Sequence, residues 1–112
     1  MKDHDKDLLY QMLSYCTKIG ERIEAYSIDE DEFVGNTALQ DMLLMPIFQI
    51  GELANALSDE FCSDHTQIPW RAIKSFRNMI AHDYGVVDPN WAWNTIIFDI
   101  PELEAFLKTC LS

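Results

Sequence analysis

Apolar residues recur at steps of three and four positions along most of this 112-residue chain. That spacing places them on one face of an α-helix, whose turn takes about 3.6 residues. Four segments show the pattern: residues 5–27, 37–61, 70–84 and 100–111. The chain has no alternating strand pair, no Asn-Gly hairpin turn and no internal repeat. These features predict an all-α antiparallel bundle of four main helices, in a single domain over residues 1–112.

Proline, glycine and capping residues set the predicted boundaries. Pro46 lies inside the second segment and should kink that helix, because proline removes one backbone hydrogen bond. Gly85 is placed to end the third helix. Asp88 and Pro89 match an N-cap followed by proline in the first turn. Residues 91–98 are rich in aromatic and β-branched side chains and fit a short helix or a strand, and this start signal favours the helix.

Two positions leave alternatives open. Residues 29–32, Asp-Glu-Asp-Glu, either form the first turn of a helix, where acids favour the positive end of the dipole, or belong to a loop. In the loop interpretation Asn36 or Thr37 is the N-cap of the next helix. Gly51 marks either a close approach by another helix or a tolerated surface glycine, at a cost of about 1 kcal/mol relative to alanine.

The chain is strongly acidic, with a net charge of −11. Between Ile23 and Trp70 there is no lysine or arginine, while the following acids accumulate: Glu24, Asp29, Glu30, Asp31, Glu32, Asp41, Glu52, Asp59, Glu60 and Asp64. A protein that binds nucleic acid through bulk electrostatics should be basic. The acidic surface therefore either suits a basic protein partner or keeps the protein in solution.

The cysteines and the N-terminus indicate the compartment. Cys16, Cys62 and Cys110 lie far apart without a Cys-x-x-Cys pair, and the three histidines are scattered. This spacing favours buried free thiols over a zinc site, and we expect neither a metal nor another cofactor. The N-terminus lacks the apolar run of a signal peptide, and no stretch reaches the roughly 20 apolar residues of a membrane span. We expect a cytoplasmic protein that does not contact the membrane.

The segment from Trp70 to Gly85 is the exception to this acidity. It carries Arg71, Lys74 and Arg77, with no acidic residue before Asp83. We expect the first two cations to bind RNA phosphates, because arginine and lysine neutralise the charge of a nucleic-acid backbone.

Arg77, His82 and Tyr84 follow in close succession and form the candidate site. A histidine of near-neutral pKa can move a proton, and an arginine can hold a phosphate through two parallel hydrogen bonds. Together His82 and Arg77 suit metal-independent cleavage of an RNA phosphodiester. Asn78 would support them with a neutral hydrogen bond.

Helix geometry separates the two catalytic candidates. Positions five apart differ by about 140° around an ideal helix and by ~7.5 Å along it, so Arg77 and His82 of one chain would not face the same point. Either the helix unwinds before His82, or two chains pair so that both Arg-His sets line one cleft. The second arrangement also concentrates two sets of cations, and on this argument we predict a homodimer.

Several stretches together resemble the HepT-like toxins of the HEPN superfamily, over most of the chain. They are Gly51-Glu52, Ile68-Pro69-Trp70-Arg71, Arg77-Asn78, His82-Asp83-Tyr84, the segment Trp91 to Ile97, and Ile100-Pro101-Glu102-Leu103. The resemblance implies a homodimeric HEPN helical bundle that acts as the endoribonuclease toxin of a type VII-like toxin-antitoxin system. It assigns Arg77 and His82 as the RNase residues. It also implies a partner, an MNT-type nucleotidyltransferase antitoxin (MntA), which silences the toxin by transferring AMP to Tyr84.

Two other functions fit the same features. One is a non-catalytic helical partner that lends a nucleotidyltransferase a substrate-binding surface. The other, weaker one is a small-ligand-binding bundle, which would need an apolar pocket.

Overall fold

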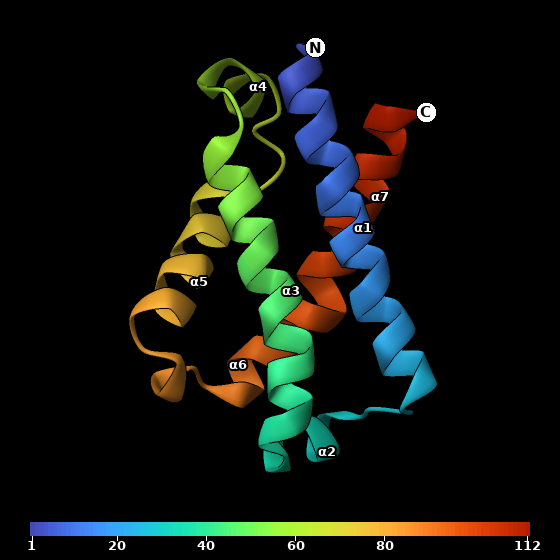
Figure 1. Cartoon of the computed structure of the whole chain (residues 1–112), viewed down its shortest axis with the longest axis vertical. Helices are drawn as coiled ribbons and strands as arrows, with labels where there is room; N and C mark the ends of the chain where they lie inside the picture. Colours follow the sequence, from blue (N-terminus) through green and yellow to red (C-terminus); the bar gives the residue numbers. More distant parts are fainter.

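The main helices alternate in direction, and the chain contains no β-strand. The structure is a computed structural model that describes all 112 residues. The four main helices are α1 (Asp3–Ala25), α3 (Thr37–Ala56), α5 (Trp70–His82) and α7 (Ile100–Leu111). Figure 1 shows α1 and α5 running one way and α3 and α7 the other. The predicted all-α antiparallel bundle is confirmed.

The connections hold more helix than predicted. The sequence predicted one short helix, but the chain forms three helices of six residues: α2 (Glu30–Gly35), α4 (Asp59–Asp64) and α6 (Pro89–Asn94). A 3₁₀ turn covers Tyr84–Val86, and a π-helical segment covers Thr95–Asp99. None of the helices is long and apolar enough to cross a membrane.

Helix α3 packs against both α1 and α5, and α7 packs against α1. A cluster of 25 buried apolar residues joins these helices into one core. Leu9 of α1, Ile50 of α3 and Leu107 of α7 are almost completely buried in it. Pro46 is also buried, and α3 continues as a helix on both sides of it. Helix α3 therefore lies in contact with α1 and α5 at once, which matters for the site below.

Of the two interpretations of the acidic segment, the helical first turn is confirmed and the loop is wrong, although the Asn36 cap that the loop interpretation named does form. The Asp29 carboxylate caps α2 by accepting a hydrogen bond from the Glu32 N–H at 2.8 Å. Asn36 then caps α3, since its side-chain oxygen accepts from the Ala38 N–H at 2.9 Å. Each helix thus begins at an oxygen-bearing side chain that satisfies an unpaired N–H of its first turn.

The predicted helix over residues 37–61 is wrong at its end, because the chain breaks there into α3 and α4. Helix α3 ends at Ala56, and Ser58 caps α4 by accepting a hydrogen bond from the Phe61 N–H at 3.1 Å. The apolar spacing continues across the break. Periodicity alone therefore does not reveal it.

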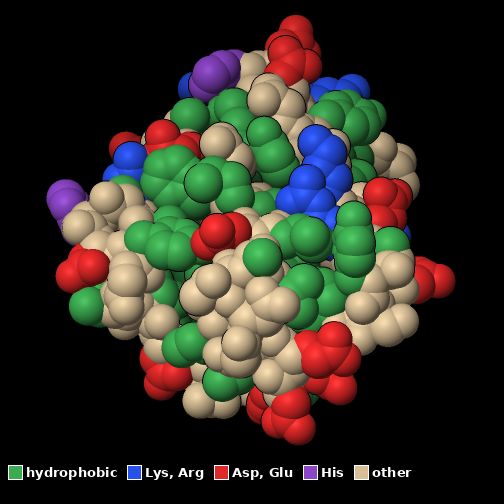
Figure 2. Space-filling view, turned by 60° about the horizontal axis from the view of Figure 1, so that its bottom comes forward, with side chains coloured by type: hydrophobic (Ala, Val, Ile, Leu, Met, Phe, Trp, Pro, Cys, Tyr) green, Lys and Arg blue, Asp and Glu red, His purple; other side chains and the backbone are tan.

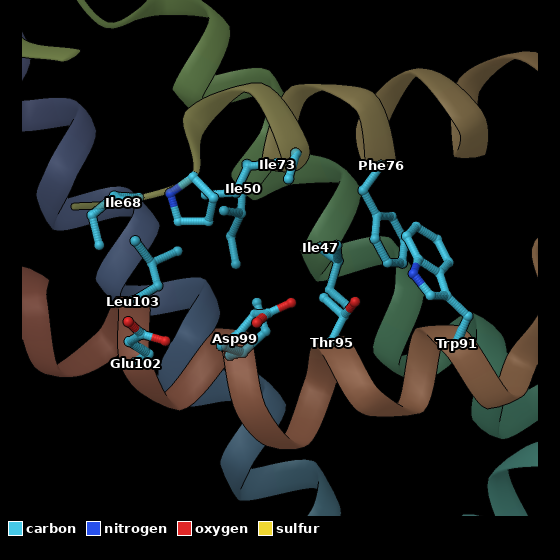
Figure 3. Close-up of a pocket in the computed structure, with 13 residues that line it drawn as sticks. Ile47, Ile50, Ile68, Ile73, Phe76, Trp91, Thr95, Asp99, Glu102 and Leu103 are labelled. Carbon is cyan, nitrogen blue, oxygen red and sulfur yellow. The ribbon is translucent and has the colours of Figure 1, made fainter. Parts of the chain in front are cut away.

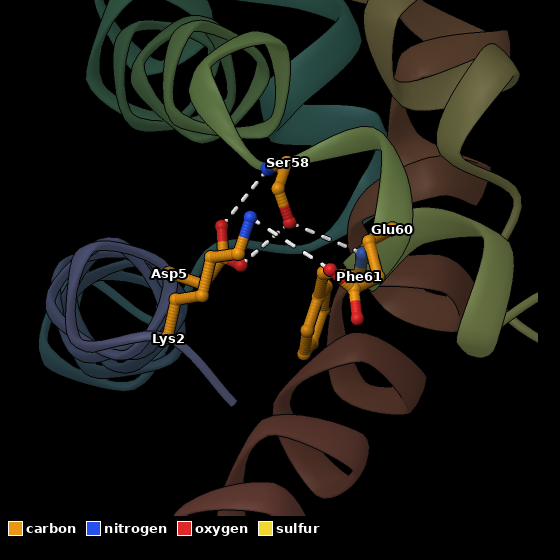
Figure 4. A network of polar contacts seen from close by, with 5 residues as sticks. All are labelled: Lys2, Asp5, Ser58, Glu60 and Phe61. Atoms are coloured by element: carbon orange, nitrogen blue, oxygen red, sulfur yellow. Dashed lines mark hydrogen bonds and ion pairs between the residues drawn. The ribbon is translucent and has the colours of Figure 1, made fainter.

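A contact from α1 stabilises the break between α3 and α4. The buried Asp5 carboxylate accepts hydrogen bonds from the Ser58 N–H at 2.9 Å and from the Ser58 hydroxyl at 2.6 Å. Figure 4 shows these bonds beside the ion pair between Lys2 and Glu60, which measures 3.7 Å. Burial acts to raise the pKa of Asp5, but the two bonds from Ser58 together with the nearby charges of His4 and Lys2 outweigh it, and the pKa lies below its usual value.

The prediction that Gly85 ends the third helix is wrong. Helix α5 ends at His82, and Asp83 leaves the helix in a non-helical conformation (φ −155°, ψ 83°) while its N–H still donates to the Met79 carbonyl. Gly85 lies inside the 3₁₀ turn, and no glycine of the chain has a positive φ. The helix stops without the left-handed glycine of a common C-terminal cap.

The predicted helix start at Asp88 and Pro89 is confirmed. The Asp88 carboxylate accepts a hydrogen bond from the Asn90 N–H at 3.0 Å, and Pro89 is the first residue of α6. The predicted helix over 91–98 is confirmed as α6 and most of the π-helical segment. Thr95 and Ile100 both keep right-handed helical dihedrals, so α6, the π-helical segment and α7 form one continuous stretch.

The three cysteines are free thiols, and one of them is buried. Burial raises the pKa of Cys16 to about 12, and it also raises the pKa values of Cys62 and Cys110, which are half-buried. The thiols therefore stay protonated near neutral pH, as expected of small hydrophobic side chains rather than reactive groups.

Candidate functional site

Helix α5 presents cations on its exposed face. The helix buries Trp70, Phe76 and Ile80 against the rest of the bundle. At about 100° per residue, four polar residues fall within an arc of about 80°: Arg71, Lys74, Asn78 and His82. We call these four residues the basic face of α5. The only ion pairs of the structure involve Lys2 and Arg77, so the charges of Arg71 and Lys74 are unpaired.

Arg77 sits beside this face, at the contact between α5 and α3. A Cβ added at Gly51 would lie only 2.2 Å from the Arg77 Cβ and 2.8 Å from its Cγ. No side chain larger than hydrogen fits between the two helices at this point. Of the two interpretations of Gly51, the close approach by another helix is confirmed.

Three neighbours fix the Arg77 guanidinium. Its Nε–H donates to the Glu52 carboxylate of α3, and its Nη1–H donates to the Asn78 Oδ1 at 3.0 Å. The guanidinium also lies 5.4 Å from the centre of the Phe48 ring, within the range of a cation–π contact. The Arg77 side chain is 26% exposed. The guanidinium has five N–H donors, and the two hydrogen bonds leave the others free for an anion.

His82 is the last residue of α5, and its side chain is exposed. The helix is unbroken from Arg77 to His82, which excludes the predicted alternative in which it unwinds before the histidine. An intact helix keeps these residues about 140° apart around its axis. A single chain therefore does not bring Arg77 and His82 to one point.

Tyr84 turns back from the end of α5 toward α3. Its hydroxyl donates a hydrogen bond to the Asp41 carboxylate, and the residue is 37% exposed. Partial burial and the negative charge of Asp41 raise the pKa of Tyr84 above its usual value. The phenol is therefore protonated at neutral pH.

A shallow groove opens beside Tyr84, between the end of α1 and the first half of α3. Its lining residues are Arg22, Tyr26, Ala38, Asp41, Met42, Met45 and Tyr84. Figure 2 looks onto the lower end of the bundle in Figure 1, where hydrophobic side chains are interspersed with cations and carboxylates. Five of the seven residues that line the groove are hydrophobic, so the surface near Tyr84 is more apolar than the net charge of the chain suggests.

A separate pocket of about 170 Å³ lies between α5 and the stretch from α6 to α7. Figure 3 shows apolar side chains above and to the sides, with the Asp99 and Glu102 carboxylates on the α7 side. Phe76 and Trp91 stack at one end, with ring centres 4.6 Å apart. None of the candidate site residues lines this pocket.

The structure adds three residues to the predicted site. The sequence had already drawn attention to Glu52 through its glycine neighbour, but it gave no sign of Phe48 or Asp41. Asp41 is 43 residues from Tyr84 and was one carboxylate among many in the acidic segment. No group of three or more His, Cys, Asp or Glu side chains has the arrangement needed to hold a metal ion.

Comparison with known proteins links the chain to ribonucleases. The model of the family described as "Ribonuclease HepT-like" matches residues 12–110. A protein of Caldanaerobacter subterraneus subsp. tengcongensis, described as a candidate RNase, is 32% identical over 103 residues, which is 92% of this chain and 90% of the relative.

Two archaeal relatives agree with this match. A probable ribonuclease HepT of Thermococcus cleftensis is 30% identical over 95 residues, which covers 80% of this chain and 86% of the relative. A candidate RNase of Methanocaldococcus jannaschii is 24% identical over 99 residues, 88% of this chain and 89% of the relative. No solved structure matches the chain significantly.

Proposed function

Because the chain belongs to the HepT-like ribonuclease family, we propose that it is a metal-independent endoribonuclease toxin that cleaves RNA with Arg77 and His82. The observation that carries this proposal is the way in which packing and hydrogen bonds position the Arg77 side chain. Gly51 makes room for its stem, and Glu52 and Asn78 hold two of its donors. An arginine held in this way is ready to receive a phosphate at its remaining donors.

The two residues have complementary roles. His82 either takes the proton of a ribose 2′-hydroxyl as that oxygen forms a new bond to phosphorus, or gives a proton to the 5′-oxygen as the bond between phosphorus and the 5′-oxygen breaks. Arg77 stabilises the negative charge that grows on the phosphorus-bound oxygens. Asn78 orients Arg77, and the unpaired cations Arg71 and Lys74 bind neighbouring phosphates of the RNA.

A homodimer resolves the separation between Arg77 and His82. Two copies of α5 related by a twofold axis would place the arginine of one chain near the histidine of the other. The same pairing would bring two basic faces together, so that RNA meets a local concentration of cations on an otherwise acidic protein.

We further propose that an MNT-type nucleotidyltransferase antitoxin, similar to MntA, silences the protein by transferring AMP to Tyr84. Tyr84 lies two residues beyond His82, and the residue is partly exposed. AMP there adds negative charge and bulk beside the basic face of α5, which opposes RNA binding.

The test of the catalytic proposal is RNA cleavage and growth inhibition by single variants. We expect His82→Ala and Arg77→Ala each to reduce cleavage by at least about 100-fold and to abolish growth inhibition. Arg77→Lys keeps the charge and much of the packing but loses the planar fork, so it should fold normally and still cleave poorly. Two controls lie outside the proposed site: His4→Ala removes another histidine, and Lys108→Ala removes another cation. Both variants should retain activity.

One outcome would favour the non-catalytic role as a nucleotidyltransferase partner. If folded His82→Ala protein cleaves RNA and inhibits growth as the parent does, the enzymatic proposal is wrong. Circular dichroism of each variant separates loss of fold from loss of chemistry.

A further inference from the structure

The hydrogen bond between Tyr84 and Asp41 is the contact from which the inference starts. It joins the 3₁₀ turn after α5 to the exposed side of α3, and it is the only hydrogen bond to a side chain that the Tyr84 hydroxyl makes. Asp41 makes no ion pair and caps no helix end. The Asp41 carboxylate therefore forms a side-chain hydrogen bond only with the Tyr84 hydroxyl.

The groove and the turn bring three other charged or titratable groups near this pair. From α1, Arg22 and Tyr26 line the same groove, and an Nη1–H of Arg22 donates to the Met42 carbonyl at 2.7 Å. In the turn itself, the Asp83 carboxylate lies near Gly85. Asp41 is therefore the group placed to exchange a proton with the Tyr84 hydroxyl.

We propose that Asp41 is the proton acceptor for Tyr84 when its hydroxyl is modified. This inference rests on the proposed function, in which Tyr84 receives AMP. The phenolic oxygen attacks the α-phosphorus of ATP and forms a new P–O bond, and the bond from that phosphorus to the bridging oxygen breaks to release pyrophosphate. The phenolic proton passes to the Asp41 carboxylate and from there to water.

The chemistry explains why such an acceptor is needed. A tyrosine hydroxyl that stays protonated near neutral pH is a weak nucleophile, and a positioned base removes its proton as the new bond forms. The catalytic-loop aspartate of protein kinases accepts the proton of a substrate hydroxyl in this way. Here the acceptor belongs to the modified protein rather than to the transferase.

A first experiment measures the reactivity of Tyr84 without any partner. The full-length protein is treated with N-acetylimidazole, which acetylates tyrosine hydroxyls, and each tyrosine is followed by peptide mass spectrometry. Near neutral pH we expect Asp41→Asn to slow acetylation of Tyr84 by at least about tenfold. Tyr26 lines the same groove, is 60% exposed and is not bonded to Asp41, so its rate should not change.

The pH profile separates a base from a structural contact. The rate at Tyr84 in Asp41→Asn should rise about tenfold per pH unit, because only the phenolate then reacts, whereas the parent should be less steep. Asp41→Glu keeps the carboxylate and should recover part of the rate. Asp7→Asn, on the exposed side of α1, removes the same charge elsewhere and should behave as the parent. Equal Tyr84 rates and pH profiles in the parent and Asp41→Asn would overturn the proposal.

A second experiment adds the product of the neighbouring gene with ATP and Mg²⁺ and measures AMP on Tyr84. We expect Asp41→Asn to accept AMP at least about tenfold more slowly than the parent near neutral pH. Equal rates would overturn the role of Asp41 while AMP transfer itself stands. If acetylation depends on Asp41 but the parent receives no AMP, the proposed regulation fails, and Asp41 remains the proton acceptor of a nucleophilic Tyr84.

Discussion

A single missing side chain decides where Arg77 lies. Gly51 lets the stem of Arg77 reach α3, where the Glu52 carboxylate meets its guanidinium. Any larger residue at position 51 would push α5 away from α3 and draw Arg77 off Glu52. The glycine and the arginine therefore act as one structural unit, although 25 residues of sequence lie between them.

This pairing predicts that Gly51→Ala is destabilising and impairs the site. The new Cβ would lie 2.2 Å from the Arg77 Cβ, so we expect the free energy of unfolding to fall by about 1–3 kcal/mol, as in other overpacked cores. We also expect RNA cleavage to fall in the folded protein. Urea unfolding followed by circular dichroism measures the first effect.

Gly20→Ala is the matched control. Gly20 lies within α1 with no atom within 4 Å of an added Cβ, so alanine there should raise the free energy of unfolding by about 0.4–1 kcal/mol. A Gly51→Ala protein as stable as Gly20→Ala would show that α3 and α5 separate without cost.

At the scale of helices, capping and contacts between helices decide where each element stops. Asp29, Asn36, Ser58 and Asp88 each accept a hydrogen bond from the first turn of the following helix. Two of these caps, Asn36 and Asp88, were among the predicted N-caps, whereas Asp29 was placed in a helical first turn or a loop. Ser58 was not predicted, and its position also depends on Asp5 from another helix.

The Asp5 contact predicts a pH-dependent stability. The pKa of Asp5 is lower in the folded protein than its ordinary value of 3.8. Its carboxylate therefore stabilises the fold above that value, and the contribution is lost as the pH falls through the lower folded pKa. At neutral pH we expect Asp5→Asn to reduce the free energy of unfolding by about 1–3 kcal/mol.

Unfolding curves over a range of pH check this prediction. The difference between the parent and Asp5→Asn should shrink as the pH drops below about 4. Asp7→Asn, which removes an exposed carboxylate of the same helix, should show a much smaller difference at neutral pH. If the difference in the free energy of unfolding between the parent and Asp5→Asn stays constant down to strongly acid pH, the Asp5 carboxylate is not the source of the pH dependence.

At the scale of the whole molecule, the proposed mechanism requires a unit larger than one chain, because Arg77 and His82 are separated on α5. The intact α5 keeps the two side chains on different sides of one helix. In the proposed dimer each site takes Arg77 from one chain and His82 from the other. Mutations in the two residues should then complement each other across the dimer.

Mixing two inactive variants tests this arrangement. When Arg77→Ala and His82→Ala proteins are unfolded together and refolded, half of the dimers should be mixed and should contain one intact site. We expect cleavage to recover to about a quarter of the parent level. Sedimentation of the same samples checks that dimers form. Full activity in a parent protein that is monomeric at micromolar concentration would show that one chain suffices.

The sequence alone was enough to predict the features that depend on residues close together in the chain. Apolar spacing predicted the four main helices, Asp88 and Pro89 predicted the start of α6, and the segment from Arg77 to Tyr84 carried the family resemblance. These signals are local, because a helix is stabilised by side chains three and four residues apart and by caps at its ends.

Only the tertiary structure decided the contacts between distant residues. Glu52 with Arg77, Asp41 with Tyr84 and Asp5 with Ser58 are separated by 25, 43 and 53 residues, and each joins two helices. Whether such residues meet depends on how the helices pack and rotate against one another. No periodicity within either helix encodes that, and the energy of each contact exists only once the core has formed.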